Sequence, residues 1–279
     1  MDSIIRKNKQ NQIVILCKVI LLFQIAGMFS QIWNYGSKFS SNLWYYLGLD
    51  SDLAKYVDKG AMGIILGLTL LGFVYEKRWI YSAIAAWVFF LACNAFYHGG
   101  SFGAVYSPFA HGVRYGLPLS LAIYLGHKES RFEHLLIGLR WGVAITFIAH
   151  GIEAIYLNPK FIDFLIRIPR TYLDIEVSQG LAESLLIPIG VIDIFLGVVI
   201  LRQENKYVLA YMAFWGLLTA TVRLMFSPSH GFDPMLIRAA NGLVPIAILM
   251  AALARTLSKG SDEGNLEPTP VPGTRKAAV

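Results

Sequence analysis

Apolar residues in this chain come in runs of about 20, separated by short polar or charged segments. A run of that length lets an α-helix cross the hydrocarbon core of a bilayer. The pattern therefore predicts an all-α, polytopic integral membrane protein with about eight transmembrane helices, surrounded by lipid. The predicted spans are residues 13–33, 57–75, 79–97, 108–126, 135–157, 182–201, 206–226 and 236–256.

Landmark residues of the first half return in the second half. The matched pairs are Lys18/Arg140, Lys38/Lys160, Phe39/Phe161, Gly60/Gly190, Leu66/Leu196, Gly67/Gly197, Trp87/Trp215, Pro108/Pro234, Gly116/Gly242 and Leu117/Leu243. The spacing within pairs changes only between apolar blocks, so the length differences fall in loops. Four spans in each half, an even number, make both halves enter and leave the membrane on the same side. The sequence thus predicts two parallel four-helix repeats.

The repeats define the predicted domain boundaries. Residues 1–126 form the first repeat, 127–134 a cytoplasmic linker and 135–257 the second repeat. The polar, proline-rich segment 258–279 is predicted to be a disordered tail. In the second repeat, residues 158–181 mix apolar residues with arginines, which favours an amphipathic helix at the membrane interface.

Composition and charge agree with a membrane protein. Charged residues make up only 15% of the chain, against about 25% in soluble domains. The net charge of +6 comes largely from basic residues at the span ends nearest both termini. The positive-inside rule then predicts that both termini are cytoplasmic. The expected location is the cell (inner) membrane. Because the positive charge follows the membrane topology, we expect no nucleic-acid partner. Cys17 and Cys93 lie in different spans at opposite predicted depths, so we expect no disulfide.

Ionisable residues within the spans are concentrated in the second repeat. His150 and Glu153, three residues apart, share one helix face, while Asp193 lies near the middle of its span. Arg223 and Arg238 stand near the end and the start of the last two spans. The matched first-repeat residues are Met28, Gln31, Gly63, Ala95 and Gly112. The first repeat instead carries Asn94, His98, His111 and Arg114 toward its outer side.

Counted at 1.5 Å per residue, most of these groups fall in the outer part of the membrane. They predict an outward-facing polar cavity, and the expected walls are spans 79–97, 108–126, 135–157, 206–226 and 236–256. In the functional interpretation, His150 and Glu153 move a proton while arginines bind an anionic or carbonyl group. The candidate ligand-binding residues are Arg223, Arg238, Arg114, His98, His111 and Asn94.

A structural interpretation of the same residues stays open. Glu153 could form a buried ion pair with an arginine, with His150 hydrogen-bonded to a neighbouring helix. A carboxyl group at mid-membrane needs a partner or must remain protonated. Asp193 is accordingly either an interhelical hydrogen-bonding residue or a catalytic proton relay.

The sequence names no cofactor. Haem bound between helices would need axial ligands facing one another, and only His98, His111 and His150 are placed for this, without specific spacing. Haem is therefore disfavoured. The pair His150 and Glu153 supplies only two of the ligands a metal site needs, so we expect no metal.

Two short patterns in the second repeat point to a family. One is Arg140, Gly142, Phe147 and His150-Gly151; the other runs from Asp193 through Gly197 to Leu201. Together they resemble the DoxX/DoxD-like family of four-helix membrane proteins, over most of residues 135–256. Residues 13–126 resemble it weakly: Lys18 replaces the arginine and Gly63 the acidic residue.

The family includes the small subunit of thiosulfate:quinone oxidoreductase. The resemblance implies a redox-associated membrane subunit, quinone- or thiol-linked, with quinone as candidate cofactor and a redox subunit as partner. Two alternatives remain: a proton-coupled small-molecule transporter that uses Asp193, and a non-catalytic membrane scaffold.

Overall fold

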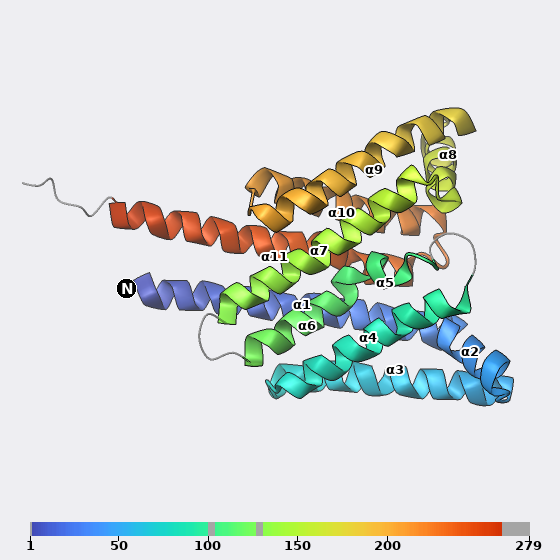
Figure 1. Cartoon of the computed structure of the whole chain (residues 1–279), viewed down its shortest axis with the longest axis horizontal. Helices are drawn as coiled ribbons and strands as arrows, with labels where there is room; N and C mark the ends of the chain where they lie inside the picture. The colour runs from blue at the N-terminus through green and yellow to red at the C-terminus, as the bar shows by residue number, and fades with distance from the viewer. Residues whose placement is uncertain (1, 100–103, 127–130, 264–279) are drawn as a thin grey trace, which may run out of the picture.

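The chain is described by a computed structural model covering residues 2–99, 104–126 and 131–263 (Figure 1). Within these residues the fold is all-α, and no strand occurs. The helices in the described part are α1 (Asp2–Tyr35), α2 (Lys38–Leu47), α3 (Ser51–Val74), α4 (Arg78–His98), α5 (Ser107–Ala110), α6 (Gly112–Gly126), α7 (Arg131–Ile155), α8 (Pro159–Leu173), α9 (Gln179–Arg202), α10 (Lys206–Phe226) and α11 (Phe232–Glu263). The predicted all-α class is confirmed.

Seven helices in the described part are long and apolar enough to cross a membrane. They are α1, α3, α4, α7, α9, α10 and α11. The remaining predicted span, 108–126, is divided at His111 into α5 and α6. The 15 residues of α6 extend about 22 Å, which is less than the roughly 30 Å of a hydrocarbon core. Seven helices of spanning length agree with an integral membrane protein, whereas the eighth is shorter than predicted.

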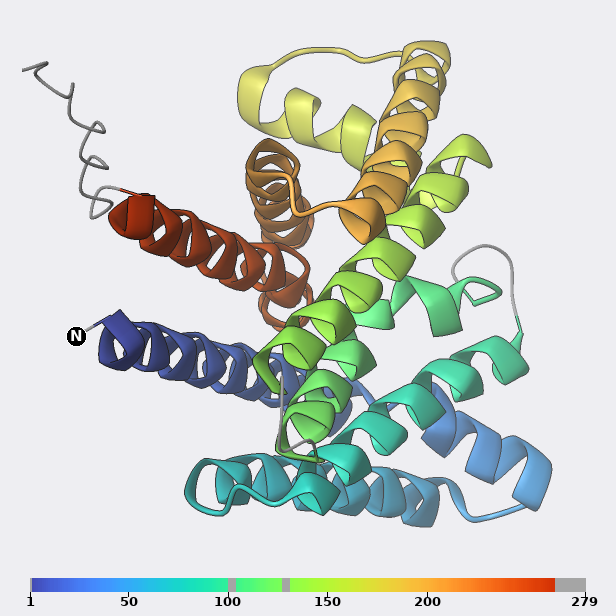
Figure 2. The same ribbon diagram turned by 60° about the vertical axis from the view of Figure 1, so that its left-hand side comes forward.

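Apart from the short α5, which occurs only in the first half, the two halves of the chain have the same order of helices. A long helix (α1 or α7) is followed by a short one (α2 or α8) and three more (α3, α4, α6 or α9, α10, α11). The halves pack together through α1 against α11 and α6 against α7 (Figure 2). The start of α1 and the end of α11 lie at one end of the bundle, and α2, α5 and α8 lie at the other (Figure 1).

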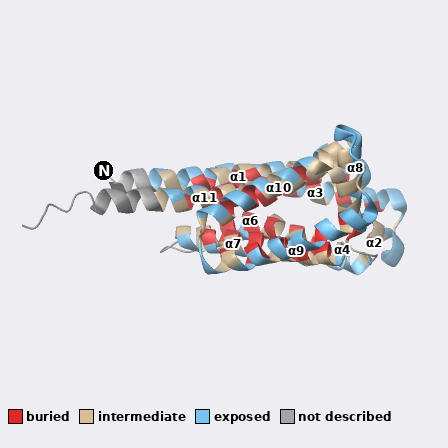
Figure 3. Ribbon diagram, turned by 90° about the horizontal axis from the view of Figure 1, so that it is seen from above, coloured by how far each residue is buried: buried red, intermediate tan, exposed pale blue. Residues whose placement is uncertain are grey.

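The hydrophobic core is continuous across both halves. Leu21, Leu121, Leu139 and Ile248, from α1, α6, α7 and α11, are all buried in one cluster. Many outward-facing apolar residues are exposed (Figure 3), as expected for helices whose outer surface meets lipid rather than water. The interface between the halves is therefore part of the core.

Glycines allow several helices to approach closely. A Cβ atom placed on Gly190 of α9 would lie 2.5 Å from the carbonyl oxygen of Gly151 on α7. A Cβ on Gly216 of α10 would meet the backbone of Asn241 on α11 at 2.6 Å. Membrane helices use small residues in this way because close backbone contact supplies packing energy that lipid does not.

The regions around the helices partly differ from the predicted boundaries. The helix expected within 158–181 is present as α8, and none of its residues is buried. α7 begins at Arg131, so the last part of the predicted linker 127–134 is helical, and 127–130 lie outside the described residues. α11 continues to Glu263, beyond the predicted start of the tail at 258. Residues 258–263 read Ser-Lys-Gly-Ser-Asp-Glu, which are mostly weak helix formers. The helix extends into them because each further residue adds a backbone hydrogen bond to a helix that is already formed. The rest of the tail, 264–279, also lies outside the described residues.

Candidate functional site

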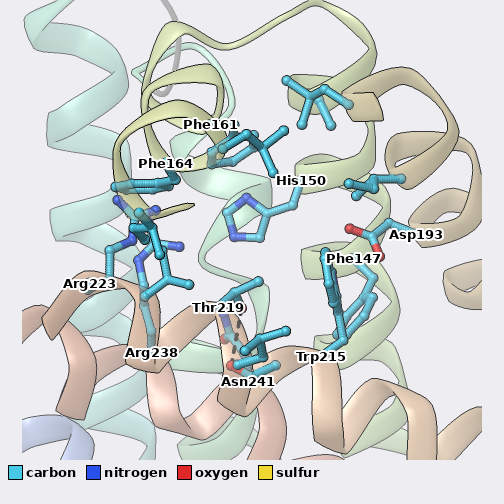
Figure 4. Close-up of a pocket in the computed structure, with 18 of the residues that line it drawn as sticks. Phe147, His150, Phe161, Phe164, Asp193, Trp215, Thr219, Arg223, Arg238 and Asn241 are labelled. Atoms are coloured by element: carbon cyan, nitrogen blue, oxygen red, sulfur yellow. Dashed lines mark hydrogen bonds between the residues drawn. The ribbon is translucent and has the colours of Figure 1, made fainter. Parts of the chain in front are cut away.

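A pocket of about 320 Å³ lies in the second half, near the end of the bundle that carries α8 (Figure 4). Helices α7, α8, α9, α10 and α11 all contribute to its lining, which is mainly apolar. The polar side chains in its wall are Thr146, His150, Asp193, Thr219, Arg223, Arg238 and Asn241. An apolar cavity with a few converging polar groups is the usual form of a small-molecule site.

The pocket does not have all the walls expected from sequence. Spans 79–97 and 108–126 were expected to contribute, but its lining comes from α8 and α9 in their place. The reason is the packing of α7, which contacts α9 on one side and α6 on the other. α6 therefore lies behind α7 as seen from the pocket.

His150 and Glu153 form the hydrogen-bonded pair that their spacing predicts. The His150 Nδ1–H donates to Glu153 Oε2 at 2.7 Å. Glu153 is only 3% exposed, and its other carboxylate oxygen, Oε1, accepts from the Nδ2 amide of Asn158 at 3.2 Å. Because Nδ1 is held by Glu153, Nε2 is the ring nitrogen left for a ligand. A carboxylate behind an imidazole stabilises its protonated form, so this pair is suited to accepting and returning a proton.

Asn158 completes this pair because the chain reverses direction after α7. Leu157 adopts a positive φ of 56°, which is uncommon for a residue with a side chain. The turn lets the backbone N–H of Asn158 donate to the carbonyl oxygen of Glu153 at 3.0 Å. The Asn158 side chain also accepts from the N–H of Lys160, which caps α8. One residue thus connects the buried carboxylate to the start of α8.

Asn158 was not among the residues selected from sequence. Its signal was present, because asparagine followed by proline is a typical helix start. That signal indicates where α8 begins, but the contact of Asn158 with Glu153 depends on the turn at Leu157. An ion pair between Glu153 and an arginine, the structural alternative, is not observed in the described residues, because the Glu153 carboxylate is hydrogen-bonded to His150 and Asn158.

Asp193 lies across the pocket from the arginines, on the other side of His150 (Figure 4). It is 6% exposed and interacts with the indole of Trp215 on α10. Its Oδ1 oxygen is buried and has no hydrogen-bond partner. Leaving a buried carboxyl oxygen unpaired costs free energy, so Asp193 is incompletely satisfied by the protein itself.

Arg223 and Arg238 bring positive charge to the opposite wall. The guanidinium carbon of Arg223 lies 4.3 Å from the centre of the Phe164 ring on α8. Its Nε is buried without a hydrogen-bond partner. Arg114 of α6 does not line the pocket, but its charge interacts with that of Arg238. The structure therefore brings together three of the predicted cationic ligand-binding residues.

His111 belongs to this neighbourhood, whereas Asn94 and His98 do not. His111 lies at the break between α5 and α6, beside Ser107 Oγ at 3.2 Å, and its charge interacts with Arg114, Arg238 and His150. His98 Nδ1 instead contacts Asn42 Oδ1 at 2.8 Å, and Asn42 donates to Asn94 Oδ1 at 3.0 Å. Asn94 and His98 thus form a separate cluster with α2.

α8 covers the pocket with its apolar face. Phe161, Phe164, Leu165 and Ile168 line the cavity, while Arg167 stacks on Phe226 of α10 at 4.3 Å. The hydroxyl of Tyr172 donates to the carbonyl oxygen of Met225 at 2.9 Å. The amphipathic helix α8 is thereby attached to α10 and closes one side of the site.

The first half contains a buried acidic residue that sequence analysis did not select. Asp58 is fully buried, and its Oδ2 accepts from the backbone N–H of Ser37 at 2.8 Å. Ser37 caps α2, so Asp58 stabilises the start of that helix. In the sequence, Asp58 is the second residue of the predicted span 57–75.

In the part of the chain that the structure describes, no group of three or more His, Cys, Asp or Glu residues is arranged to hold a metal ion. Comparisons with protein-family models, with curated proteins and with solved structures found no match to the chain.

Proposed function

We propose that this protein is a redox-associated membrane subunit that takes an amphipathic small molecule, of the quinone type, from the bilayer into its second-half pocket. The observation that carries the proposal is the His150–Glu153 pair, joined at 2.7 Å, in which His150 lines a mainly apolar cavity. The cavity suits a flat apolar ring, and the imidazole suits the exchange of a proton at a carbonyl oxygen.

The protein's own residues would contribute binding and proton transfer. His150 Nε2 would hold a proton at the ligand oxygen, and Glu153 would stabilise the imidazolium that forms. When bound, a quinone supplies the electron-accepting chemistry, and the electrons would come from a partner redox subunit. The quinone-linked form is preferred to the thiol-linked one because no cysteine lines this pocket.

The proposal includes a tandem duplication of a DoxX/DoxD-like unit. It also places the protein in the inner membrane of the cell, with both termini in the cytoplasm. Matched ion pairs support it. Lys18 Nζ lies 2.6 Å from Glu76 Oε1, and Arg140 Nη1 lies 3.6 Å from Glu204 Oε1. In each half, a basic residue of the first long helix meets a glutamate in the loop between the third and fourth elements. A shared contact at matched positions is what duplication of one scaffold predicts.

A titration with decylubiquinone tests the ligand class. Quenching of tryptophan fluorescence reports binding, because Trp215 lies in the pocket wall. His150→Ala should weaken binding about tenfold, which corresponds to about 1.4 kcal/mol. His98→Ala is the matched control, since His98 belongs to the separate Asn42 cluster, and it should leave the affinity unchanged. Absence of saturable binding to the unmodified protein contradicts the proposal.

Asp193 favours a second candidate, a proton-coupled small-molecule transporter. Its unpaired Oδ1 faces the same pocket, so a proton or a substrate amine would satisfy it. Proteoliposomes should then show substrate-dependent proton flux that Asp193→Asn abolishes. Flux that is the same in both proteins excludes this coupling. A non-catalytic scaffold, the third alternative, predicts that these substitutions change only thermal stability.

A further inference from the structure

The arginines at one end of the pocket form a group with little negative charge around them. Arg114, Arg223 and Arg238 come from three different helices, α6, α10 and α11. The charge of Arg238 is close enough to act on both of the others. Like charges brought together away from water are costly unless an opposite charge compensates them. The group is therefore either compensated by a bound anion or carries a large electrostatic cost in free energy.

The protein supplies only partial compensation. Among the described residues, no carboxylate forms a salt bridge with any of the three. Glu153 is the acidic residue that acts on Arg223 and Arg238 from a greater distance, and both of its oxygens are already hydrogen-bonded to His150 and Asn158. Asp193, whose carboxyl group does line the pocket, is on the far side of His150 (Figure 4).

The donor groups of Arg223 are also incompletely used. Phe164 covers one face of its guanidinium group, so that hydrogen bonds can form only at the edge of the plane. The buried Nε has no partner. A planar edge carrying several N–H groups matches the geometry of a phosphate or carboxylate.

The cavity next to this edge is apolar. Phe161, Leu165 and Ile168 of α8 and Leu186 and Ile189 of α9 line it. A small inorganic anion would leave this space unfilled. An anion attached to a hydrocarbon chain would use both the guanidinium groups and the apolar walls.

We propose that this pocket also binds an amphipathic oxyanion, as a second class of ligand beside the quinone, with a phosphate or carboxylate head on Arg223 and Arg238, Arg114 behind them, and an apolar tail between α8 and α9. The inference rests on the proposed role of the pocket as a ligand site and adds a charged class of molecule to it. It makes Arg223 and Arg238 the residues that hold the charged head.

The test uses the full chain in dodecyl maltoside, a detergent whose neutral dodecyl tail is already in excess. Dodecyl phosphate differs from it only in the head group, so its added affinity reports the charge. We expect saturable binding that Arg223→Gln weakens about tenfold. Arg167→Gln is the matched control, because Arg167 also stacks on a phenylalanine at 4.3 Å but is exposed. It should change the affinity less than about twofold.

A second variant covers a failure of Arg223→Gln to fold. Arg223→Lys keeps the charge but replaces the planar fork by a point charge, and it should also bind dodecyl phosphate more weakly. Equal affinity in the unmodified protein and Arg223→Lys, or equal loss in Arg167→Gln, overturns the proposal. Inorganic phosphate that binds as tightly as dodecyl phosphate overturns the amphipathic part and identifies a free oxyanion instead.

Decylubiquinone separates this inference from the proposed function. Quinone binding without dodecyl phosphate binding overturns the anion site and leaves the quinone role standing. Dodecyl phosphate binding without quinone binding supports the anion site and contradicts the quinone role. Binding of neither molecule contradicts both.

Discussion

The matched helices α3 and α9 carry glycines at the same positions, but only α9 uses them for close packing. A Cβ atom on Gly190 would lie 2.5 Å from the carbonyl oxygen of Gly151, and one on Gly197 would lie 2.7 Å from the Ile148 side chain. A Cβ atom placed on the matched Gly60 or Gly67 would have no atom of another helix within 4 Å. The same glycine pattern therefore does not by itself bring two helices into close contact.

The neighbouring helix explains the difference. The residue of α1 that corresponds to Gly151 of α7 is Phe29, whose ring lies against Trp33. A phenyl ring takes the volume that a glycine leaves free, so α3 stays further from α1 than α9 does from α7. The packing beside the short helices α2 and α8 differs between the halves as well. Phe39 of α2 stacks edge-on against Trp87 at 5.5 Å, whereas the matched Phe161 and Trp215 both line the pocket.

The largest effect is expected from leucine at the matched glycines. Gly190→Leu places a side chain against the backbone of α7 and should lower the free energy of unfolding by about 3 kcal/mol. Gly60 is exposed, so Gly60→Leu should be nearly neutral in a lipid-facing position. Thermal unfolding of both variants in detergent measures the difference. Similar losses at the two positions would show that α3 packs as closely as α9.

A smaller effect is expected when the second half is given the first half's residue at position 153. Glu153→Gln introduces the side chain found at the matched Gln31. It keeps the shape but removes the charge from the hydrogen bonds with His150 and Asn158, which should cost about 1.5 kcal/mol of stability. Glu183→Gln is the control and should cost almost nothing, because the hydrogen bond that Glu183 accepts from Gln179 is exposed to solvent. Equal unfolding temperatures for both variants would remove Glu153 from the structural support of the site.

The sequence predicts the helices well because one physical quantity, the length of an apolar run, determines them. The ends are less accurate: α1 begins at Asp2, well before residue 13. Helical hydrogen bonds continue into polar residues such as Lys9 and Gln12 once a helix is established, so hydropathy marks the apolar part of the helix rather than its whole length. The span 108–126 differs from the prediction for another reason. It is divided into α5 and α6 by a backbone break at His111, which hydropathy does not register.

The candidate site was predictable where its residues share one helix or one depth in the membrane. His150 and Glu153 follow from their three-residue spacing, and Arg223 with Arg238 from their similar depth. Helix rotation and the path of loops are not encoded in depth. The grouping of Asn94 and His98 with Asn42, and the return of Asn158 to Glu153, depend on α2 and on the turn at Leu157. Those contacts needed the structure.

The smallest expected effect separates the first turns of α3 and α9. Asp50 caps α3 by accepting from the N–H groups of Leu53 and Asp52, whereas α9 is capped by the hydroxyl of Ser178. The backbone N–H groups of Leu53 and then Asp52 stabilise the carboxylate and hold the pKa of Asp50 below its ordinary value of 3.8.

A group whose folded pKa is lowered contributes its stability above the unfolded pKa and loses it as the pH falls through the folded one. The cap of α3 should therefore be complete above about pH 4 and weaken in more acidic solution. Hydrogen exchange should show a small loss of protection at the amides of Asp52 and Leu53, while protection at Leu181 in α9 stays constant. Asp50→Asn, which cannot titrate, should remove the acid dependence. An unchanged acid response in that variant would mean that another group controls the end of α3. The two halves would then differ in their response to pH for a reason unrelated to their caps.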